Sequence, residues 1–468
     1  MANSLQQFQT LRSLSSLLLC LAWIAHAQAD SFTAERFDNW HQWRGPNADG
    51  FAPHADPPLH WDESTNIQWK VDIPGSGSST PIVWGDRIFI LTAIDTDRMP
   101  DPAIDSTVND RPAMPAPRRG GKKGPGVEPV TTPTPNTVYQ FDILCLDRNN
   151  GQLLWRKTAA EEVPQEGHHP SHDYASASPI TDGQQLYVSF GSRGLYCYDL
   201  DGNFRWKRSL GHMQTKRGFG EGASPALYRS SLVVNWDHEG ESFIVCFDTQ
   251  MGNEKWRTPR SEGTTWNTPL IVEGGGAVQV IINATNRTRS YDLTNGQQIW
   301  ECGGQVQNPI PSPVARNGIV YCTSGYLGYI VNAIPLTAHG DLTKSDQIAW
   351  HFEKASPYIA SPLLCDNLLY FTKAENAILY CLDADTGAVV YGDRRLPDLG
   401  TIYSSPVGAA GKIYLTGREG TTLVLGAGAQ GEIRATNKLD EQINASLALA
   451  GKQLFLRGDK HLYAIKEH

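Results

Sequence analysis

The sequence predicts an all-β fold, an eight-bladed β-propeller. Three observations predict it. A Ser-Pro or Thr-Pro pair recurs along the chain, each interval between pairs holds four short strand-like runs, and a lone strand near the N-terminus supplies a fourth strand that the last interval lacks. A repeat length in the forties, built from several strands, is typical of a propeller blade.

The recurring pair marks the start of each unit. From the second unit onward, the spacing from one proline to the next is 46, 44, 44, 49 and 44 residues, whereas the longer first gap holds an insertion. Ser446-Leu447 opens a degenerate eighth unit. The seven prolines are Pro81, Pro179, Pro225, Pro269, Pro313, Pro362 and Pro406.

Each unit reads as four strands joined by turns. After Pro179 come a turn at Asp182-Gly183 and then the runs 186–190, 195–199 and 204–206, which are aromatic or β-branched and bounded by Gly or Asp. An Asp at the end of the third strand and a Gly a few residues later recur between units. This pattern suits a hairpin turn in which Gly takes a positive φ.

A tryptophan closes the fourth strand of most units, and we expect it to pack one blade against the next. A periodic tryptophan is more typical of packing than of chemistry, and each such side chain buries roughly 150–250 Å². These residues are Trp155, Trp206, Trp256, Trp300 and Trp350.

The combined pattern resembles a known family of repeats. A Ser/Thr-Pro start, a third strand ending in Leu-Tyr-x-x-Asp, a Thr-Gly-type turn and a closing Trp are similar to the pyrroloquinoline-quinone (PQQ) propeller repeat. Quinoprotein alcohol dehydrogenases and the outer-membrane assembly lipoprotein BamB share that repeat. The resemblance covers nearly everything after Trp61 and implies a fold, since enzymes and scaffolds both use it.

The ends of the chain predict how the ring closes. The last unit, 446–465, has three strands, whereas 67–70 looks like an isolated fourth strand that carries Trp69. We expect this N-terminal strand to complete the last blade, which removes open sheet edges. Residues 61–468 then form a single domain after an N-terminal lead, 30–60, and we expect a monomeric ring.

The first residues read as a targeting segment. Arg12 precedes the apolar stretch 14–25, and Ala27-Gln28-Ala29 fits a cleavage site, so 1–29 is predicted to be a signal peptide. We therefore expect export to the periplasm or secretion. The formal net charge of −9 argues against a nucleic-acid partner, and no later run is long and apolar enough to span a bilayer.

The first blade carries a long insertion, 95–137. It is rich in Pro and contains the basic run 118–123, Arg-Arg-Gly-Gly-Lys-Lys. This composition predicts a disordered loop.

Propeller topology predicts where function lies. One face, here named the loop face, carries the connections into each blade and the turns between strands two and three; the opposite turn face carries the short remaining turns. Mixed charges and aromatics gather on the loop face, as a polar pocket requires. The predicted ligand-binding residues are His168, His172, Asp173, Lys216, Arg217, Glu221, Trp236, Asp237, His238, Trp266, Asn267, Arg287 and Arg418.

The histidine-rich loop 166–174 raises the question of a metal site. Its three imidazoles and the carboxylate of Asp173 are ligands that zinc or copper accepts. Pro170 excludes the helical spacing of a two-histidine motif, so we predict a polar rim and no metal site.

The resemblance to BamB implies a non-enzymatic, exported scaffold that holds a protein or an envelope polymer on the loop face. We predict no catalytic residue and no cofactor for it.

Two alternatives remain open. A PQQ-dependent dehydrogenase with calcium could use Glu221, Asp237, Trp266 and Asn267, but the vicinal cysteine pair and the haem motif common in those enzymes are absent from the sequence. A carbohydrate-binding propeller could use Trp236 and Trp266 as stacking platforms.

Overall fold

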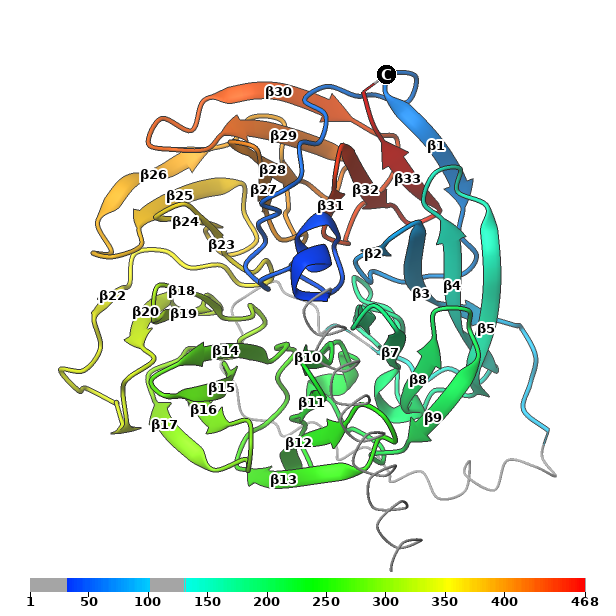
Figure 1. The fold of residues 1–468 in the computed structure, drawn as a ribbon, viewed down its shortest axis with the longest axis horizontal. Helices are drawn as coiled ribbons and strands as arrows, with labels where there is room; N and C mark the ends of the chain where they lie inside the picture. The colour runs from blue at the N-terminus through cyan, green and yellow to red at the C-terminus, as the bar shows by residue number, and fades with distance from the viewer. Residues whose placement is uncertain (1–31, 102–129, 131, 468) are drawn as a thin grey trace, which may run out of the picture.

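The computed structural model describes residues 32–101, 130 and 132–467 of the protein. Eight antiparallel sheets stand in a ring, each with its first strand next to the axis and its last strand on the circumference (Figure 1). The predicted all-β, eight-bladed propeller is confirmed. The predicted signal peptide, 1–29, lies outside the described residues.

Blades 1 to 4 follow one another along the chain. Their strands, from the axis outward, are β2 (Ile82–Trp84), β3 (Arg87–Asp95), β4 (Tyr139–Asp147) and β5 (Leu153–Glu162); β6 (Ile180–Thr181), β7 (Gln185–Ser189), β8 (Leu195–Asp199) and β9 (Phe204–Arg208); β10 (Ala226–Tyr228), β11 (Ser231–Trp236), β12 (Ser242–Asp248) and β13 (Glu254–Arg260); and β14 (Leu270–Gly274), β15 (Ala277–Ile282), β16 (Thr288–Asp292) and β17 (Gln298–Cys302).

Blades 5 to 8 complete the ring. Their strands are β18 (Val314–Arg316), β19 (Ile319–Ser324), β20 (Ile330–Pro335) and β22 (Trp350–Phe352); β23 (Leu363–Cys365), β24 (Leu368–Thr372), β25 (Ile378–Asp383) and β26 (Val389–Arg395); β27 (Val407–Ala409), β28 (Lys412–Thr416), β29 (Thr421–Gly426) and β30 (Ile433–Lys438); and β31 (Ala448–Ala450), β32 (Gln453–Arg457), β33 (His461–Ile465) and β1 (Ile67–Asp72). A short strand, β21 (Gly340–Asp341), adds in parallel to the edge of β17.

The middle strands of each blade supply the core. β11 and β29 are buried along their whole length, because neighbouring blades cover both faces. The outermost strands alternate between buried and exposed residues, as β30 shows. Short runs of apolar residues therefore suffice to build each inter-blade layer.

The recurring Ser/Thr-Pro pairs form a chain of hydrogen bonds between blades. In each case the backbone N–H of the Ser or Thr donates to the hydroxyl of the equivalent residue in the next blade, at 2.9 to 3.1 Å. The residues joined in this order are Thr80, Ser178, Ser224, Thr268, Ser312, Ser361, Ser405 and Ser446. The hydroxyl explains why each pair begins with Ser or Thr.

The periodic tryptophans link the outer strands to the next blade. Trp206 donates from Nε1 to the Thr249 carbonyl at 3.0 Å, and its ring covers Gly252, where φ is +69° and an added Cβ would lie 2.7 Å from the indole. Trp69, Trp155, Trp256 and Trp350 make the same kind of bond to a carbonyl of the following blade. Trp300 differs, since it bonds Gln279 and lies under β21.

The N-terminal strand closes the ring. β1 pairs antiparallel with β33, from Ile67 against Ile465 to Asp72 against His461. Trp69 then donates to the Arg148 carbonyl of blade 1 at 2.9 Å. The predicted completion of the last blade by a strand from the start of the chain is confirmed.

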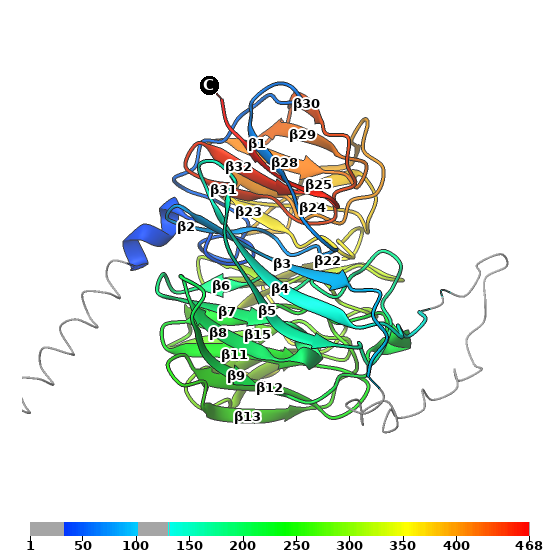
Figure 2. The same cartoon turned by 90° about the vertical axis from the view of Figure 1, so that its right-hand side faces the viewer.

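The N-terminal lead crosses the axis on the turn face (Figure 1). Trp40 exchanges two backbone hydrogen bonds with Val83 of blade 1, and further along the lead Asp56 donates to the Gly451 carbonyl in the first turn of blade 8. Figure 2 shows η1 (Arg36–Asp38) projecting from this side of the ring. Most of the lead therefore packs against the ring.

Arg44 is the centre of that crossing. Its guanidinium is 1% exposed and donates to the carbonyls of Pro406, at 2.8 Å, and Pro362, at 2.6 Å. Burial lowers the pKa of Arg44 to about 10. The lead thereby ties together blades 6 and 7 from inside the ring.

The ends of the insertion 95–137 have defined contacts, which the prediction of disorder missed. Asp95 ends β3, Thr96 bonds Val138, Arg98 pairs with Glu161, and the Thr132 hydroxyl donates to the Arg217 carbonyl. Residues 102–129 and 131 lie outside the described residues. None of the helices in the described part of the chain has the length and apolar character needed to cross a membrane.

Candidate functional site

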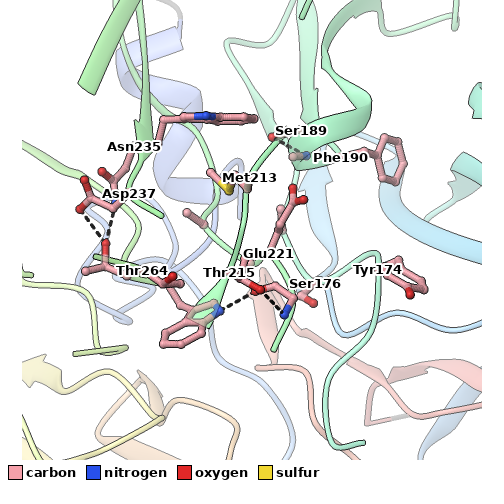
Figure 3. Close-up of a pocket in the computed structure, with 18 of the residues that line it drawn as sticks. Tyr174, Ser176, Ser189, Phe190, Met213, Thr215, Glu221, Asn235, Asp237 and Thr264 are labelled. Carbon is pink, nitrogen blue, oxygen red and sulfur yellow. Dashed lines mark hydrogen bonds between the residues drawn. The ribbon is translucent and has the colours of Figure 1, made fainter. Parts of the chain in front are cut away.

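A cleft opens on the loop face where the connecting loops of blades 2, 3 and 4 meet (Figure 3). It opens to solvent, and the space between its walls is about 660 Å³ when that open solvent is included. Its wall combines apolar side chains, such as Phe190 and Met213, with several polar ones. Proteins bind ligands in concave sites of this composition.

Glu166 is a buried carboxyl group in the wall of the cleft. It accepts hydrogen bonds from Thr215, at 3.0 Å from the backbone N–H and 2.5 Å from Oγ1. Burial raises the pKa of Glu166 to about 7, although the bonds from Thr215 oppose the rise. Within the described part of the chain Glu166 belongs to no ion pair, since Arg193 pairs with Glu221.

Glu221 is held by several donors. Its carboxylate accepts from the Ser192 backbone and hydroxyl, both at 2.6 Å, from Gln165 Nε2 at 2.8 Å and from Arg193 at 3.2 Å. These bonds fix η3 (Gly191–Arg193) against the connecting loop of blade 3. The role of Glu221 is therefore structural, because its hydrogen bonds hold the loops of the cleft together.

Asp237, one of the predicted ligand-binding residues, lines the cleft but is buried in an ion pair. Its carboxylate bonds Arg260 Nε at 2.7 Å and Nη2 at 2.9 Å, and it also accepts from Thr265 Oγ1 at 2.8 Å. Both members of the Asp237–Arg260 pair are 0% exposed. The sequence interval of 23 residues between them gives no local sign of this pairing.

Trp236 and Trp266 differ in how much of the indole ring is accessible to a ligand. Trp236 is 2% exposed and stacks on Phe243, so it cannot serve as an open stacking platform. Trp266 is half-buried, lines the cleft, and donates from Nε1 to the Gly220 carbonyl at 2.7 Å. Asn267 is fully buried and bonds the Pro311 carbonyl at 2.6 Å.

The histidine-rich loop is tied into the protein. His168 packs edge-on against Tyr174, and His172 Nε2 lies 3.0 Å from the Glu221 carbonyl oxygen. Burial lowers the pKa of His172. Asp173 accepts hydrogen bonds from Ser78 and from the Ala175 backbone. Over the described residues no group of three His, Cys, Asp or Glu side chains could hold a metal ion.

The remaining predicted residues lie outside the cleft wall. Lys216 donates to Asn308 of the blade 5 connection at 2.7 Å, Arg217 is exposed, and His238 is buried against the Glu241 backbone. Arg287 pairs with two acidic residues of blades 4 and 5, and Arg418 lies over the Tyr403 ring. Of the predicted set, the cleft brings together Glu221, Trp236, Asp237 and Trp266.

The sequence prediction missed Glu166 and Asn235. Asn235 is 1% exposed, and its Oδ1 has no hydrogen-bond partner among the described residues. A polar residue inside the apolar run of β11 is a signal that could have identified it. Nothing in the local sequence distinguishes Glu166 from the rest of its loop.

The donor set does not fit a calcium–PQQ group. Calcium needs several carboxylate or amide oxygens that point at one centre. The oxygens of Glu221, Asp237 and Asn267 already accept hydrogen bonds from the protein. Arg193 and Arg260 also neutralise the two carboxylates, so these side chains are committed to the protein's own structure.

Solved structures show the same fold at low sequence identity. BamB from Moraxella catarrhalis is 13% identical, with a TM-score of 0.51, and covers 71% of this chain and 92% of its own. The designed protein Ika8 is 13% identical, with a TM-score of 0.51, over 73% and 98%. The quinohemoprotein alcohol dehydrogenase ADHIIG from Pseudomonas putida HK5 is 9% identical, with a TM-score of 0.55, over 94% and 81%.

No curated protein sequence matches the chain significantly. The family model described as outer membrane protein assembly factor BamB matches residues 140–392. Because this match spans more than half of the 468 residues, the chain belongs to the family of outer membrane protein assembly factor BamB.

Proposed function

We propose that this chain is a non-catalytic, exported propeller that binds a segment of a partner protein on its loop face, as a BamB-like scaffold of the cell envelope. One observation carries the proposal. The acidic and amide side chains that a dehydrogenase would use, Glu221, Asp237 and Asn267, are bonded to the protein itself. These three side chains therefore hold the loop face in a fixed shape for binding, and none of the three is free to act as a reactive group.

The connecting loops support a binding role because they are held in place before any partner arrives. His169 donates its backbone N–H to the Phe219 carbonyl at 3.1 Å, which joins the loops of blades 2 and 3. Lys216 reaches Asn308 and so joins the loops of blades 3 and 5. A preorganised surface loses less conformational entropy on binding.

The proposed location comes from the start of the sequence. Arg12, the apolar run 14–25 and the small residues before Asp30 have the pattern of a cleaved export signal. Export would place the propeller where an envelope partner is present.

Selection of peptides from a displayed library, on the purified mature protein, tests the binding role. We expect selected peptides to bind the loop face and Trp266→Ala to weaken them about tenfold or more, as loss of a central aromatic contact does. Phe204→Ala removes an aromatic that is 58% exposed on the outer strand of blade 2, and it should leave binding unchanged. Equal effects of the two variants would contradict the proposal.

Reconstitution with PQQ and calcium tests the absence of catalysis. We expect no dye-coupled oxidation of alcohols or sugars. Turnover that is lost in Glu221→Ala would replace the scaffold with a quinoprotein dehydrogenase.

A further inference from the structure

The charges in the cleft leave one carboxyl group without a cation. Asp237 is paired with Arg260, and Glu221 with Arg193. Among the described residues, the Glu166 carboxylate receives hydrogen bonds from Thr215 alone. Because the two oxygens of a carboxylate together accept about four hydrogen bonds, Glu166 retains acceptor capacity.

A second acceptor in the same cleft is also unused. Asn235 Nδ2 donates to Thr265 Oγ1 at 3.0 Å, whereas its Oδ1 is buried without a partner among the described residues. Figure 3 shows Asn235 on the same side of the cleft as Asp237, opposite Tyr174. A buried, unpaired carbonyl oxygen is costly, so a ligand that brings N–H donors would satisfy it.

The remaining wall suits a cation. Trp266 lines the cleft with aromatic surface and Met213 adds a polarisable thioether, whereas the Tyr174 ring already faces the Arg193 guanidinium, 5.5 Å from the ring centre. Cationic groups bind favourably against aromatic rings, and guanidinium does so while donating hydrogen bonds from its edge. The wall of the cleft therefore offers a partner for each property of a guanidinium: its N–H donors, its positive charge and its flat apolar face.

We infer that the cleft accepts a basic side chain, guanidinium or ammonium, from the bound partner segment. This inference rests on the proposed peptide-binding function and names the chemistry of the partner. A sugar is less well matched, since Trp236 is buried and an uncharged ligand would leave Glu166 without a counter-ion.

The affinity then depends on pH. Burial is the largest cause of the rise in the pKa of Glu166 to about 7. Two charged groups also act on this carboxyl: Glu221 raises its pKa and Arg193 lowers it. The Tyr174 hydroxyl donates to the Glu166 backbone carbonyl. An ionised Glu166 attracts the cation. Binding should therefore weaken as the pH falls below about 7.

Calorimetry with two probes tests the inference. Acetyl-argininamide and the isosteric, uncharged acetyl-citrullinamide are titrated into the mature protein, and any library-selected peptide is compared with its citrulline version. We expect the arginine form to bind about tenfold or more tightly, the range for a charge-assisted bond. Glu166→Gln should remove this preference and its dependence on pH, whereas Glu375→Gln, on the loop face of blade 6, should keep both.

The outcomes separate the inference from the function on which it rests. Peptides that need Trp266 but bind equally as arginine and citrulline forms would overturn the inference alone. Arginine derivatives that bind through Glu166 while no peptide binds would overturn the peptide-scaffold function alone. Tighter binding of a neutral oligosaccharide than of either probe would overturn both. If Glu166→Gln lowers the melting temperature, Asn235→Leu is the second variant, and an unchanged affinity for acetyl-argininamide in it counts against the inference.

Discussion

The two faces of the ring are held by different kinds of contact. On the turn face, the N-terminal lead exchanges backbone hydrogen bonds with Val83 and donates one to the Gly451 carbonyl, and the buried Arg44 donates to backbone carbonyls. On the loop face, ion pairs between side chains, such as Asp237–Arg260 and Glu221–Arg193, add to backbone bonds such as that from His169 to Phe219. The loop face therefore depends on particular residues more than the turn face does.

The contrast between the faces indicates where specificity can be placed. Backbone contacts stay the same when side chains change, so the turn face gives the ring a constant frame. Side-chain contacts change with each substitution, so the loop face can acquire a distinct surface without altering the frame. The proposed recognition groups, Glu166 and Asn235, lie on the second kind of surface.

Removal of the lead and the first strand should have the largest effect. Deleting residues 30–72 from the mature chain takes away Arg44 and β1 and exposes the edge of β33. We expect a loss on the order of 10 kcal/mol, comparable to the whole stability of a domain. The deletion should therefore abolish the cooperative thermal transition seen by circular dichroism. An unchanged melting temperature would show that the contacts of the lead on the turn face do not stabilise the ring and that the ring does not close through β1.

Breaking the buried pair of the loop face should rank second. Asp237→Ala leaves the Arg260 guanidinium 0% exposed and without its main partner. Such a loss costs about 3–5 kcal/mol, which urea unfolding measures. Arg257→Ala, whose ion pair with Glu254 is exposed, is the control and should cost less than about 1 kcal/mol. Similar losses of unfolding free energy in both variants would show that the buried Asp237–Arg260 pair contributes no more to stability than an exposed ion pair.

A conservative change at the centre of the turn face should cost less. Arg44→Lys keeps the charge but loses the fork that reaches Pro406 and Pro362 together, so one buried carbonyl is left unpaired. We expect a loss of about 1–3 kcal/mol in urea unfolding. A loss larger than that of Asp237→Ala would reverse this ranking, because a single side chain would then dominate the face built on backbone contacts.

The last prediction concerns the dependence of stability on pH. The pKa of Glu166 is raised to about 7 in the folded protein, from an ordinary value of 4.5, so the folded state binds the extra proton between these limits. The contribution of this group to the free energy of unfolding therefore falls as the pH rises from about 4.5 to 7. Glu166→Gln should remove that part of the slope in urea unfolding measured from about pH 5 to 8. An identical slope in both proteins would place the titration elsewhere.

Much of the fold could be predicted because its determinants recur. The Ser/Thr-Pro pair and the closing Trp appear in successive blades, and the same contact acts on each, as with Ser178 and Trp206. The lead escaped prediction because its partners, such as Gly451, lie far along the chain. The site escaped for the same reason. Asp237 reads as exposed until Arg260 is seen beside it, and Glu166 gains its raised pKa only through burial in the folded ring.

The pairing of β1 with β33 also bears on biosynthesis. Ile67 lies opposite Ile465, so β1, which is synthesised early, stays unpaired until β33 has been synthesised. Contacts between such distant residues form slowly, because a long loop must close first. Seven blades can form in the order of their synthesis, but the eighth is completed only once β33 has been made. A truncated product therefore keeps an unpaired sheet edge that a protease or chaperone can recognise, and the ring acts as a check on its own completeness.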